Sequence, residues 1–142
     1  MSIIRVVEYH NMPYYFAYAS NLNKKQMLER CPESKPLYKA TLPNYKLIFA
    51  DWSRDVRGGK ATIIVFKGEK VLGAVYEVSE QCMSRLDRYE TSYTRTRVNV
   101  FSEDGDPVEA ITYIKSGQPK ETKPSPEYLA TIQQGYKDWQ LL

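Results

Sequence analysis

The sequence has few of the residues that bind metals or cross-link a chain. It contains 1 His and 2 Cys among 142 residues. Cys31 and Cys82 lie far apart, and neither has a second Cys or His at the spacing of a metal-ligand pair. We therefore expect neither a disulfide framework nor a structural zinc site, and both side chains are predicted to be buried free thiols.

Long apolar runs and blocks of one charge are also absent. No segment reaches the roughly 20 apolar residues that a membrane helix needs, and Arg5, Glu8 and His10 stand where a signal peptide would be apolar. The formal net charge is +3, with acidic and basic residues interleaved, so the chain lacks the basic patch that nucleic-acid backbones require. These features predict a cytoplasmic protein that binds neither nucleic acid nor membranes.

The order of the predicted elements indicates the fold class. Its 142 residues match the commonest length of a single domain with one hydrophobic core. Helices are predicted at 24–30, from Ser79 to Glu90, and from Pro126 onward. Strands are predicted at 14–18, 45–50, 61–66, 71–78, 93–101 and 108–114, with a hairpin turn at Gly68 and Glu69. Because these elements follow no regular βαβ rhythm, they predict an α+β fold whose sheet can curl into a small barrel.

One predicted strand-to-helix junction carries small and polar residues. In the run YFAYASNL, Ala19, Ser20 and Asn21 follow the first strand and precede the first helix. The backbone N–H groups of Ser20, Asn21 and Leu22 would have no intrahelical partners there, so they can bind a carboxylate or an oxyanion. The same residues can instead simply cap the helix, which is their usual role.

Three further segments are common sequence features when each is taken alone. Glu90, in LDRYE, ends a predicted helix, where most glutamates are solvated charges. The glycines of RGGKATI, at 57–63, form a turn or a point of close approach. The segment PSPEY, at 124–128, is a typical helix start. None of them specifies a function by itself.

Together, and in this order, these segments resemble the γ-glutamylcyclotransferase family, which is related to the plant avirulence-induced-gene proteins. The family signature YFAYGSNL corresponds here to YFAYASNL, and its LDxxEG segment corresponds to LDRYET. The glycine pair, Tyr93 with Arg95, Tyr113 and the PSPxY helix entry follow at compatible separations. The resemblance covers 14–142 as a single domain and leaves 1–13 as an N-terminal extension.

The resemblance implies a small mixed β-barrel with peripheral helices and a cavity closed by the signature loop. It implies an enzyme that needs no metal or organic cofactor and that cyclises a small γ-glutamyl amide to 5-oxoproline, releasing a free amine or amino acid. Glu90 is the implied general acid and base, with a pKa raised by an enclosed setting. The implied substrate-binding residues are Tyr18, Ala19, Ser20, Asn21, Leu22, Tyr93 and Tyr128.

The sequence leaves several alternatives open. Ala19 and Thr91 stand where the family has glycines, which motivates a γ-glutamylamine or another γ-glutamyl metabolite as the substrate, with a different leaving amine. A catalytically silent barrel that binds a ligand or a partner through its tyrosines is the non-enzyme alternative, although most of the 12 Tyr are expected to pack in strands. The oligomeric state is open, and a homodimer is compatible with the sequence.

Overall fold

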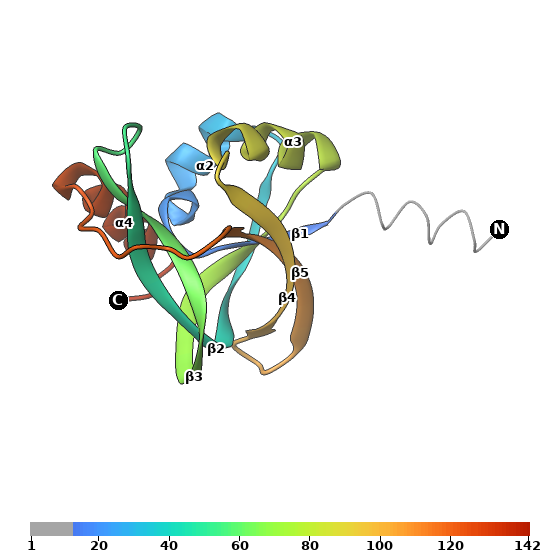
Figure 1. Cartoon of the computed structure of the whole chain (residues 1–142). Coiled ribbons are helices and arrows are strands. Elements are labelled where there is room, and N and C mark those ends of the chain that lie inside the picture. The colour runs from blue at the N-terminus through green and yellow to red at the C-terminus, as the bar shows by residue number, and fades with distance from the viewer. Residues whose placement is uncertain (1–12) are drawn as a thin grey trace.

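The strands close into a mixed barrel. The computed structural model describes residues 13–142, so the predicted N-terminal extension, including His10, lies almost entirely outside the described residues. The strands are β1 (Tyr14–Ala17), β2 (Lys35–Ser53), β3 (Gly58–Glu77), β4 (Tyr93–Ser102) and β5 (Pro107–Lys115). Their order around the barrel is β1-β3-β2-β4-β5, and all neighbours pair antiparallel except β1 and β5, which pair parallel (Figure 1). The α+β class and the small mixed barrel are confirmed.

β2 and β3 form one long hairpin whose turn lies at residues 54–57. The predicted hairpin at Gly68 and Glu69 is wrong, because both halves of β3 pair with β2 and only a bulge around Gly68 separates them. Gly68 has a φ of 90°, and its N–H donates to Oδ1 of Asn44 at 3.1 Å. A glycine with positive φ suits a bulge as well as a turn, so the local sequence does not distinguish the two.

The helices begin where the sequence predicts. The 3-10 turn η1 (Ser20–Leu22) leads into α2 (Lys24–Arg30), and α3 (Glu80–Tyr89) and α4 (Pro126–Asp138) follow. The side chains of Asn23, Ser79 and Ser125 each accept a backbone N–H at the start of α2, α3 and α4, as N-caps do. In Figure 1, α2 and α3 lie over one end of the barrel and α4 lies beside the β2–β3 hairpin. None of the helices within residues 13–142 is long and apolar enough to cross a membrane.

A disulfide joins α2 to α3, so the prediction of free thiols is wrong. Cys31, the C-cap of α2, is bonded to Cys82 in the first turn of α3, with Cα atoms 5.5 Å apart and both side chains fully buried. The sequence separation of 51 residues hid this pairing, because only the closed barrel brings the two helices together. Disulfides persist mostly in oxidising compartments. The bond therefore counts against the expected cytoplasmic location, which stays a prediction.

The helices α2 and α3 each bury only one side. On α2, Met27 is fully buried in the core, but its neighbour Leu28 is 56% exposed. On α3, Met83 and Leu86 are fully buried. The buried side of each helix faces the barrel end, which leaves the rest of the helix in solvent.

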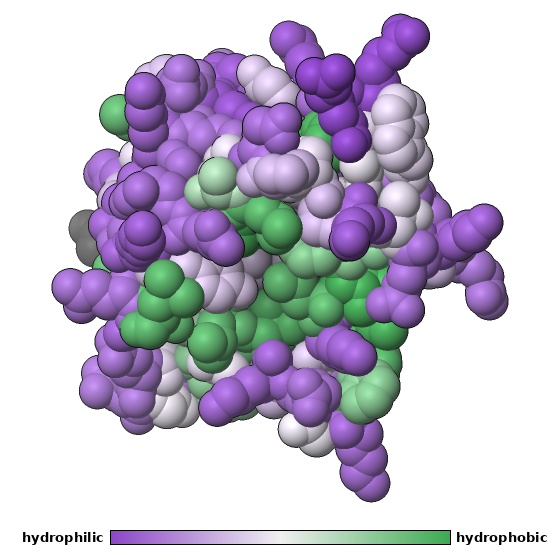
Figure 2. Space-filling view, turned by 90° about the vertical axis from the view of Figure 1, so that its left-hand side faces the viewer, coloured by the Kyte–Doolittle hydropathy of each residue, from purple (hydrophilic) through white to green (hydrophobic). Residues whose placement is uncertain are grey.

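Part of the apolar surface remains exposed. Figure 2 shows an apolar band, in green, across one face of the molecule with polar side chains around it. The exposed large apolar side chains include Trp52, Val65 and Phe66 of the β2–β3 hairpin. Patches of this kind often bind partners. The structure of residues 13–142 does not test the predicted homodimer, which stays a prediction.

Candidate active site

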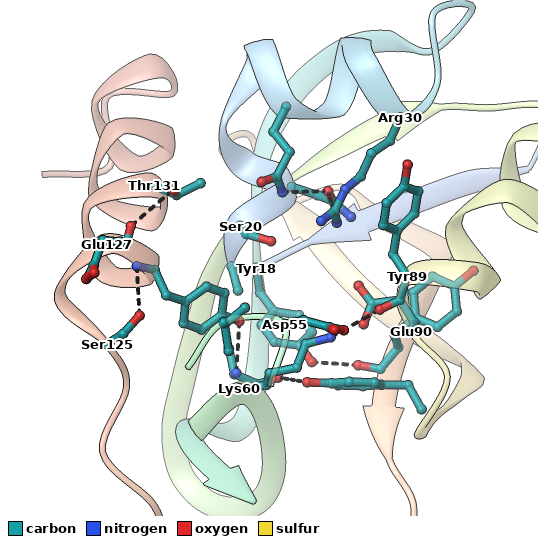
Figure 3. Close-up of a pocket in the computed structure, with 18 of the residues that line it drawn as sticks. Tyr18, Ser20, Arg30, Asp55, Lys60, Tyr89, Glu90, Ser125, Glu127 and Thr131 are labelled. Atoms are coloured by element: carbon teal, nitrogen blue, oxygen red, sulfur yellow. Dashed lines mark hydrogen bonds between the residues drawn. The ribbon is translucent and has the colours of Figure 1, made fainter. Parts of the chain in front are cut away.

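A cavity of about 680 Å³ lies between the η1 turn, the end of α3 and the start of α4 (Figure 3). Every sequence-predicted site residue except Leu22 lines it: Tyr18, Ala19, Ser20, Asn21, Glu90, Tyr93 and Tyr128. Leu22 is fully buried in the core instead, and its carbonyl accepts the indole N–H of Trp139 at 3.0 Å. Segments far apart in the sequence thus meet at one cavity.

Glu90 is the C-cap of α3 and lines the cavity beside Tyr89 (Figure 3). Burial raises the pKa of the Glu90 carboxyl, and the positive charges of Lys60, Arg30 and Lys115 partly oppose that rise. Within residues 13–142, Glu90 forms no ion pair with any of these cations. A carboxyl whose pKa is raised by partial desolvation is a stronger base and holds a proton more readily than a solvated carboxyl.

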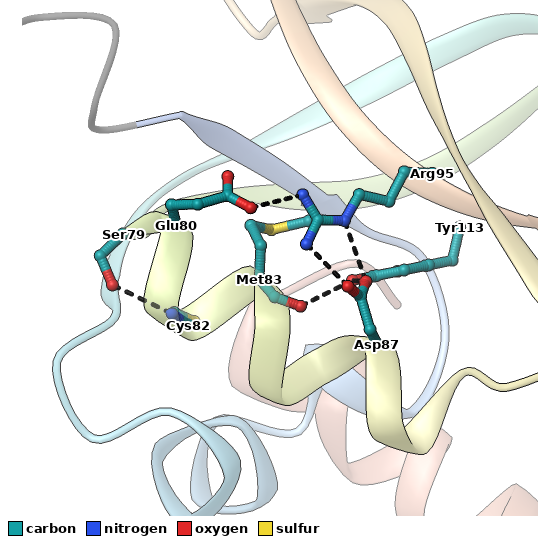
Figure 4. A network of polar contacts seen from close by, with 7 residues as sticks. All are labelled: Ser79, Glu80, Cys82, Met83, Asp87, Arg95 and Tyr113. Carbon is teal, nitrogen blue, oxygen red and sulfur yellow. Dashed lines mark hydrogen bonds and ion pairs between the residues drawn. The ribbon is translucent and has the colours of Figure 1, made fainter.

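A polar network anchors the helix that ends at Glu90 (Figure 4). Asp87 accepts two hydrogen bonds from Arg95, at 2.9 and 2.7 Å, and one from the hydroxyl of Tyr113 at 2.6 Å. Arg95 also donates to Glu80, in the first turn of the same helix, at 2.8 Å. The hydrogen bonds from Arg95 hold the pKa of the Asp87 carboxyl below its usual range. One arginine on β4 therefore holds both ends of α3.

The backbone of the signature loop offers two amides rather than three. The N–H of Leu22 donates to the carbonyl of Ala19 at 3.0 Å, so the expectation that this amide is available is wrong. Within residues 13–142, the N–H groups of Ser20 and Asn21 donate no hydrogen bond. Ala19 has a φ of −137° and a ψ of −120°. This position therefore does not have the positive φ that would favour the family's glycine.

The side chain of Asn21 ties the loop to its surroundings. It donates to the hydroxyl of Tyr15 at 2.9 Å and accepts from Gln26 at 3.2 Å and from Arg30 at 3.1 Å. Asn21 is almost fully buried, and an unpaired amide there would be costly. The cap of α2 is Asn23, so Asn21 positions the loop rather than capping the helix.

The hydroxyls of the three cavity tyrosines have different roles. Tyr18 donates to the carbonyl of Tyr113 at 2.6 Å, and Tyr93 donates to the carbonyl of Ala61 at 2.5 Å. Tyr128 instead accepts the N–H of Ala61 at 3.0 Å, so its own proton stays available. Burial raises the pKa of all three, that of Tyr128 to about 12. All three are therefore neutral at neutral pH, and Tyr128 is the donor among them.

The glycine pair at the start of β3 is a point of close approach, one of the two roles that the sequence predicts. A Cβ on Gly59 would clash with the carbonyl of Thr122, and a Cβ on Gly58 would lie 2.8 Å from the carbonyl oxygen of Lys123. The N–H of Gly59 donates to that same carbonyl of Lys123 at 2.9 Å. The pair therefore lets the segment before α4 pack against β3, which brings Tyr128 to the cavity.

Sequence reasoning missed several polar residues of the cavity, above all Tyr15, Arg30 and Lys60. Two of these positions carried a signal, because Tyr15 is the first residue of the signature run YFAYASNL and Arg30 ends the helix after it, whereas the position of Lys60 carried none. The guanidinium of Arg30 lies over the ring of Tyr89 at 4.1 Å, and Nζ of Lys60 donates to the carbonyl of Tyr89 at 3.1 Å. The cations Arg30 and Lys60 and the carboxyl-bearing Glu90 thus line the same cavity.

The arrangement can carry out proton transfer beside bound anions. Its lining includes the carboxyl-bearing Glu90, the loop residues Ser20 and Asn21, whose N–H groups donate no hydrogen bond within residues 13–142, and the cations Arg30 and Lys60. In the part of the chain from 13 to 142, no group of three or more His, Cys, Asp or Glu residues could hold a metal ion.

Comparison with known proteins identifies the family. The family described as "Gamma-glutamyl cyclotransferase, AIG2-like" matches residues 15–140. The chain belongs to this family. Among curated members, a γ-glutamylcyclotransferase from human is 30% identical over 132 residues, which cover 87% of this chain and 70% of the human protein. One from cattle matches to the same extent. The expectation of an enzyme of the γ-glutamylcyclotransferase type is confirmed by these matches.

Solved structures of the family share the fold. One named gamma-glutamyl cyclotransferase superposes with a TM-score of 0.87 at 28% identity and covers 92% of this chain and 81% of that one. An AIG2-like protein from mouse superposes with a TM-score of 0.57 at 25% identity, covering 84% of each chain. The barrel and its helices are therefore those of the family.

Proposed function

We propose that this protein cyclises a γ-glutamyl amide by internal aminolysis, releasing 5-oxoproline and a free amine or amino acid, with Glu90 as general acid and base. The observation that carries the proposal is that Glu90, a carboxyl with a raised pKa, lines the same cavity as the loop residues Ser20 and Asn21. Family membership supports the reaction type. The cytoplasmic location and the absence of a cofactor stay predictions.

The reaction needs the substrate to be held in a folded conformation. The α-amine of the glutamyl group attacks its own γ-carbonyl, which forms the five-membered lactam and expels the attached amine. Near-attack geometry can lower such a barrier by up to about 7–11 kcal/mol. A cavity of about 680 Å³ is in the range of small-molecule sites. Its walls come from strands, helices and the signature loop, which together would hold the substrate in its folded conformation.

Two proton transfers accompany this step. The α-ammonium must first lose one proton to solvent, because an ammonium group cannot attack. The attacking nitrogen then loses a second proton to a base as the C–N bond forms, and the leaving nitrogen must gain a proton because an amide anion is a poor leaving group. One carboxyl can do both when it contacts both nitrogens. The burial that raises the pKa of Glu90 makes its acid form more accessible near neutral pH. Glu90 ends the cycle in the ionisation state in which it began.

The negative charges of substrate and intermediate require donors. The amides of Ser20 and Asn21 would bind the glutamyl carboxylate or the tetrahedral oxyanion, and one such donor is worth about 3 kcal/mol in comparable sites. The hydroxyl of Tyr128 is a further donor, while Tyr18 and Tyr93 would act as acceptors because their protons are engaged. Ala19 lines the cavity beside these groups.

The experiment that tests this function is release of 5-oxoproline from γ-glutamyl-alanine by the purified wild-type protein. We expect turnover that rises with enzyme concentration. A protein that binds γ-glutamyl-alanine but releases no 5-oxoproline would favour the catalytically silent barrel. The placement of Glu90 in the cavity, rather than in bulk solvent, argues against that alternative.

A further inference from the structure

The cavity contains two partly buried cations that have no carboxylate partner, Arg30 and Lys60, and its other two cations are exposed, Arg57 and Arg88. Arg30 reaches it from α2 and Lys60 from β3, on different sides of the cavity (Figure 3). Each is held by a neutral group: the side-chain oxygen of Asn21 for Arg30 and the carbonyl of Tyr89 for Lys60. Among residues 13–142, neither cation forms an ion pair. Both keep donors that are free to bind an anion from solution.

Partly buried cations without partners are costly unless a ligand pairs with them. Desolvation lowers the pKa of Lys60, whereas the nearby charges of Glu90 and Asp55 raise it. An incoming carboxylate would favour the charged ammonium further. The cavity therefore has a place for a second anion in addition to the one that the loop amides would bind.

The two candidate classes of substrate differ in the number of carboxylates that each molecule carries. A γ-glutamylamine has one carboxylate, that of the glutamyl group. A γ-glutamyl amino acid has a second carboxylate, one carbon away from the leaving nitrogen. Because Glu90 must contact that nitrogen, the second carboxylate has to lie near Glu90 as well. Of the cations whose charge acts on the Glu90 carboxyl, Lys60 has the largest effect, and its ammonium is bound to the carbonyl of the residue before Glu90.

We propose that Lys60 binds the carboxylate of the leaving amino acid and thereby makes γ-glutamyl amino acids, rather than γ-glutamylamines, the preferred substrates. This inference rests on the proposed cyclotransferase function and specifies its substrate class. Arg30 is bound to Asn21 of the signature loop, so it serves the glutamyl end of the substrate. Lys60 is the residue that distinguishes a leaving group with a carboxylate from one without it.

The test compares two substrates that differ only in this carboxylate: γ-glutamyl-alanine and γ-glutamyl-ethylamine. The quantity measured is the ratio of their kcat/KM values for 5-oxoproline release. This ratio does not depend on how much of a variant is folded. We expect the wild type to prefer γ-glutamyl-alanine and Lys60→Met to lower the ratio roughly 10- to 100-fold, the effect of one charge-assisted hydrogen bond at about 1.4 kcal/mol per factor of ten. Lys60→Arg, which keeps the charge, should retain most of the preference.

Lys67→Met is the matched control, because Lys67 is an exposed lysine on the same strand and does not line the cavity. Its ratio should equal that of the wild type. An unchanged ratio in Lys60→Met would overturn the inference, and equal losses on both substrates would assign Lys60 to Glu90 or to the glutamyl end. A wild type that does not prefer γ-glutamyl-alanine would also overturn it. Either result leaves the cyclotransferase function intact. If the wild type released 5-oxoproline from neither substrate, both the proposed function and this inference would fail.

Discussion

The anchor of α3 offers a sharp test of how the fold positions Glu90. Asp87→Asn removes the charge that Arg95 pairs with and leaves the size of the side chain almost unchanged. The helix would lose the bidentate ion pair with Arg95 and the charged acceptor of the Tyr113 hydroxyl. We expect lower stability and a less fixed end of the helix at Glu90, whose N–H donates to the carbonyl of Asp87 at 3.2 Å.

The magnitude follows from the exposure of the partners. The side chains of Arg95 and Asp87 are 31% and 43% exposed, so solvent screening keeps their pair to roughly 0.5–1 kcal/mol. Tyr113 is 3% exposed, and weakening the acceptor of a buried hydroxyl costs about 1–2 kcal/mol. The sum is about 1.5–3 kcal/mol, or roughly 5–10 °C in Tm for a chain of this size. The end of α3 would also move, and kcat/KM should fall by on the order of tenfold.

The assay is thermal and urea unfolding of the wild type, Asp87→Asn and a control, Glu80→Gln. Glu80 binds the same arginine, but its side chain is 64% exposed, so its loss should cost less than about 1 kcal/mol. Because the folded-state pKa of Asp87 is depressed, its contribution is present above the unfolded pKa of about 4 and is lost as pH falls through the folded value. The gap between wild type and Asp87→Asn should therefore close in acid. Equal costs for the two variants, or a gap that widens in acid, would refute this reasoning.

Two further predictions concern the packing and the cross-link. Gly59→Ala should destabilise the protein by about 1–3 kcal/mol, because its Cβ meets the carbonyl of Thr122; urea unfolding measures this, and a neutral effect would mean that the segment before α4 shifts freely. Reduction of the Cys31–Cys82 bond, which closes a separation of 51 residues, should lower the free energy of unfolding by about 4 kcal/mol on the chain-entropy estimate. Urea midpoints with and without reductant test that, with the double serine variant as the insensitive control; equal midpoints for the wild type would contradict it.

Local sequence patterns predicted where the helices start better than where the strands lie. The helices start at Lys24, after Ser79 and at Pro126 as expected, because the signals for a helix start depend on residues close in sequence. The first half of β2, at 35–44, was not predicted as a strand. The bulge at Gly68 and the Cys31–Cys82 bond were not predicted. Both depend on which distant segments meet, and no local pattern contains that information.

The candidate site was predictable only in part, and for the same reason. The motif around Glu90 and the loop from Ala19 to Asn21 were expected to form one site, and residues of both line the same cavity. Lys60 was not singled out, because a lysine that follows two glycines has no distinctive local pattern. The core position of Leu22 was likewise hidden, since it depends on packing against Trp139 at the other end of the chain.

The central claim is that the carboxyl of Glu90 carries both proton transfers of the cyclisation. The most direct measurement is 5-oxoproline release from γ-glutamyl-alanine by wild type, Glu90→Gln and the exposed control Glu69→Gln, with unfolding curves to show that all three fold. Glu90→Gln keeps the shape of the side chain but cannot take a proton, so we predict a loss of at least about 100-fold in kcat and wild-type turnover for Glu69→Gln. Equal turnover by the wild type and Glu90→Gln would contradict the account.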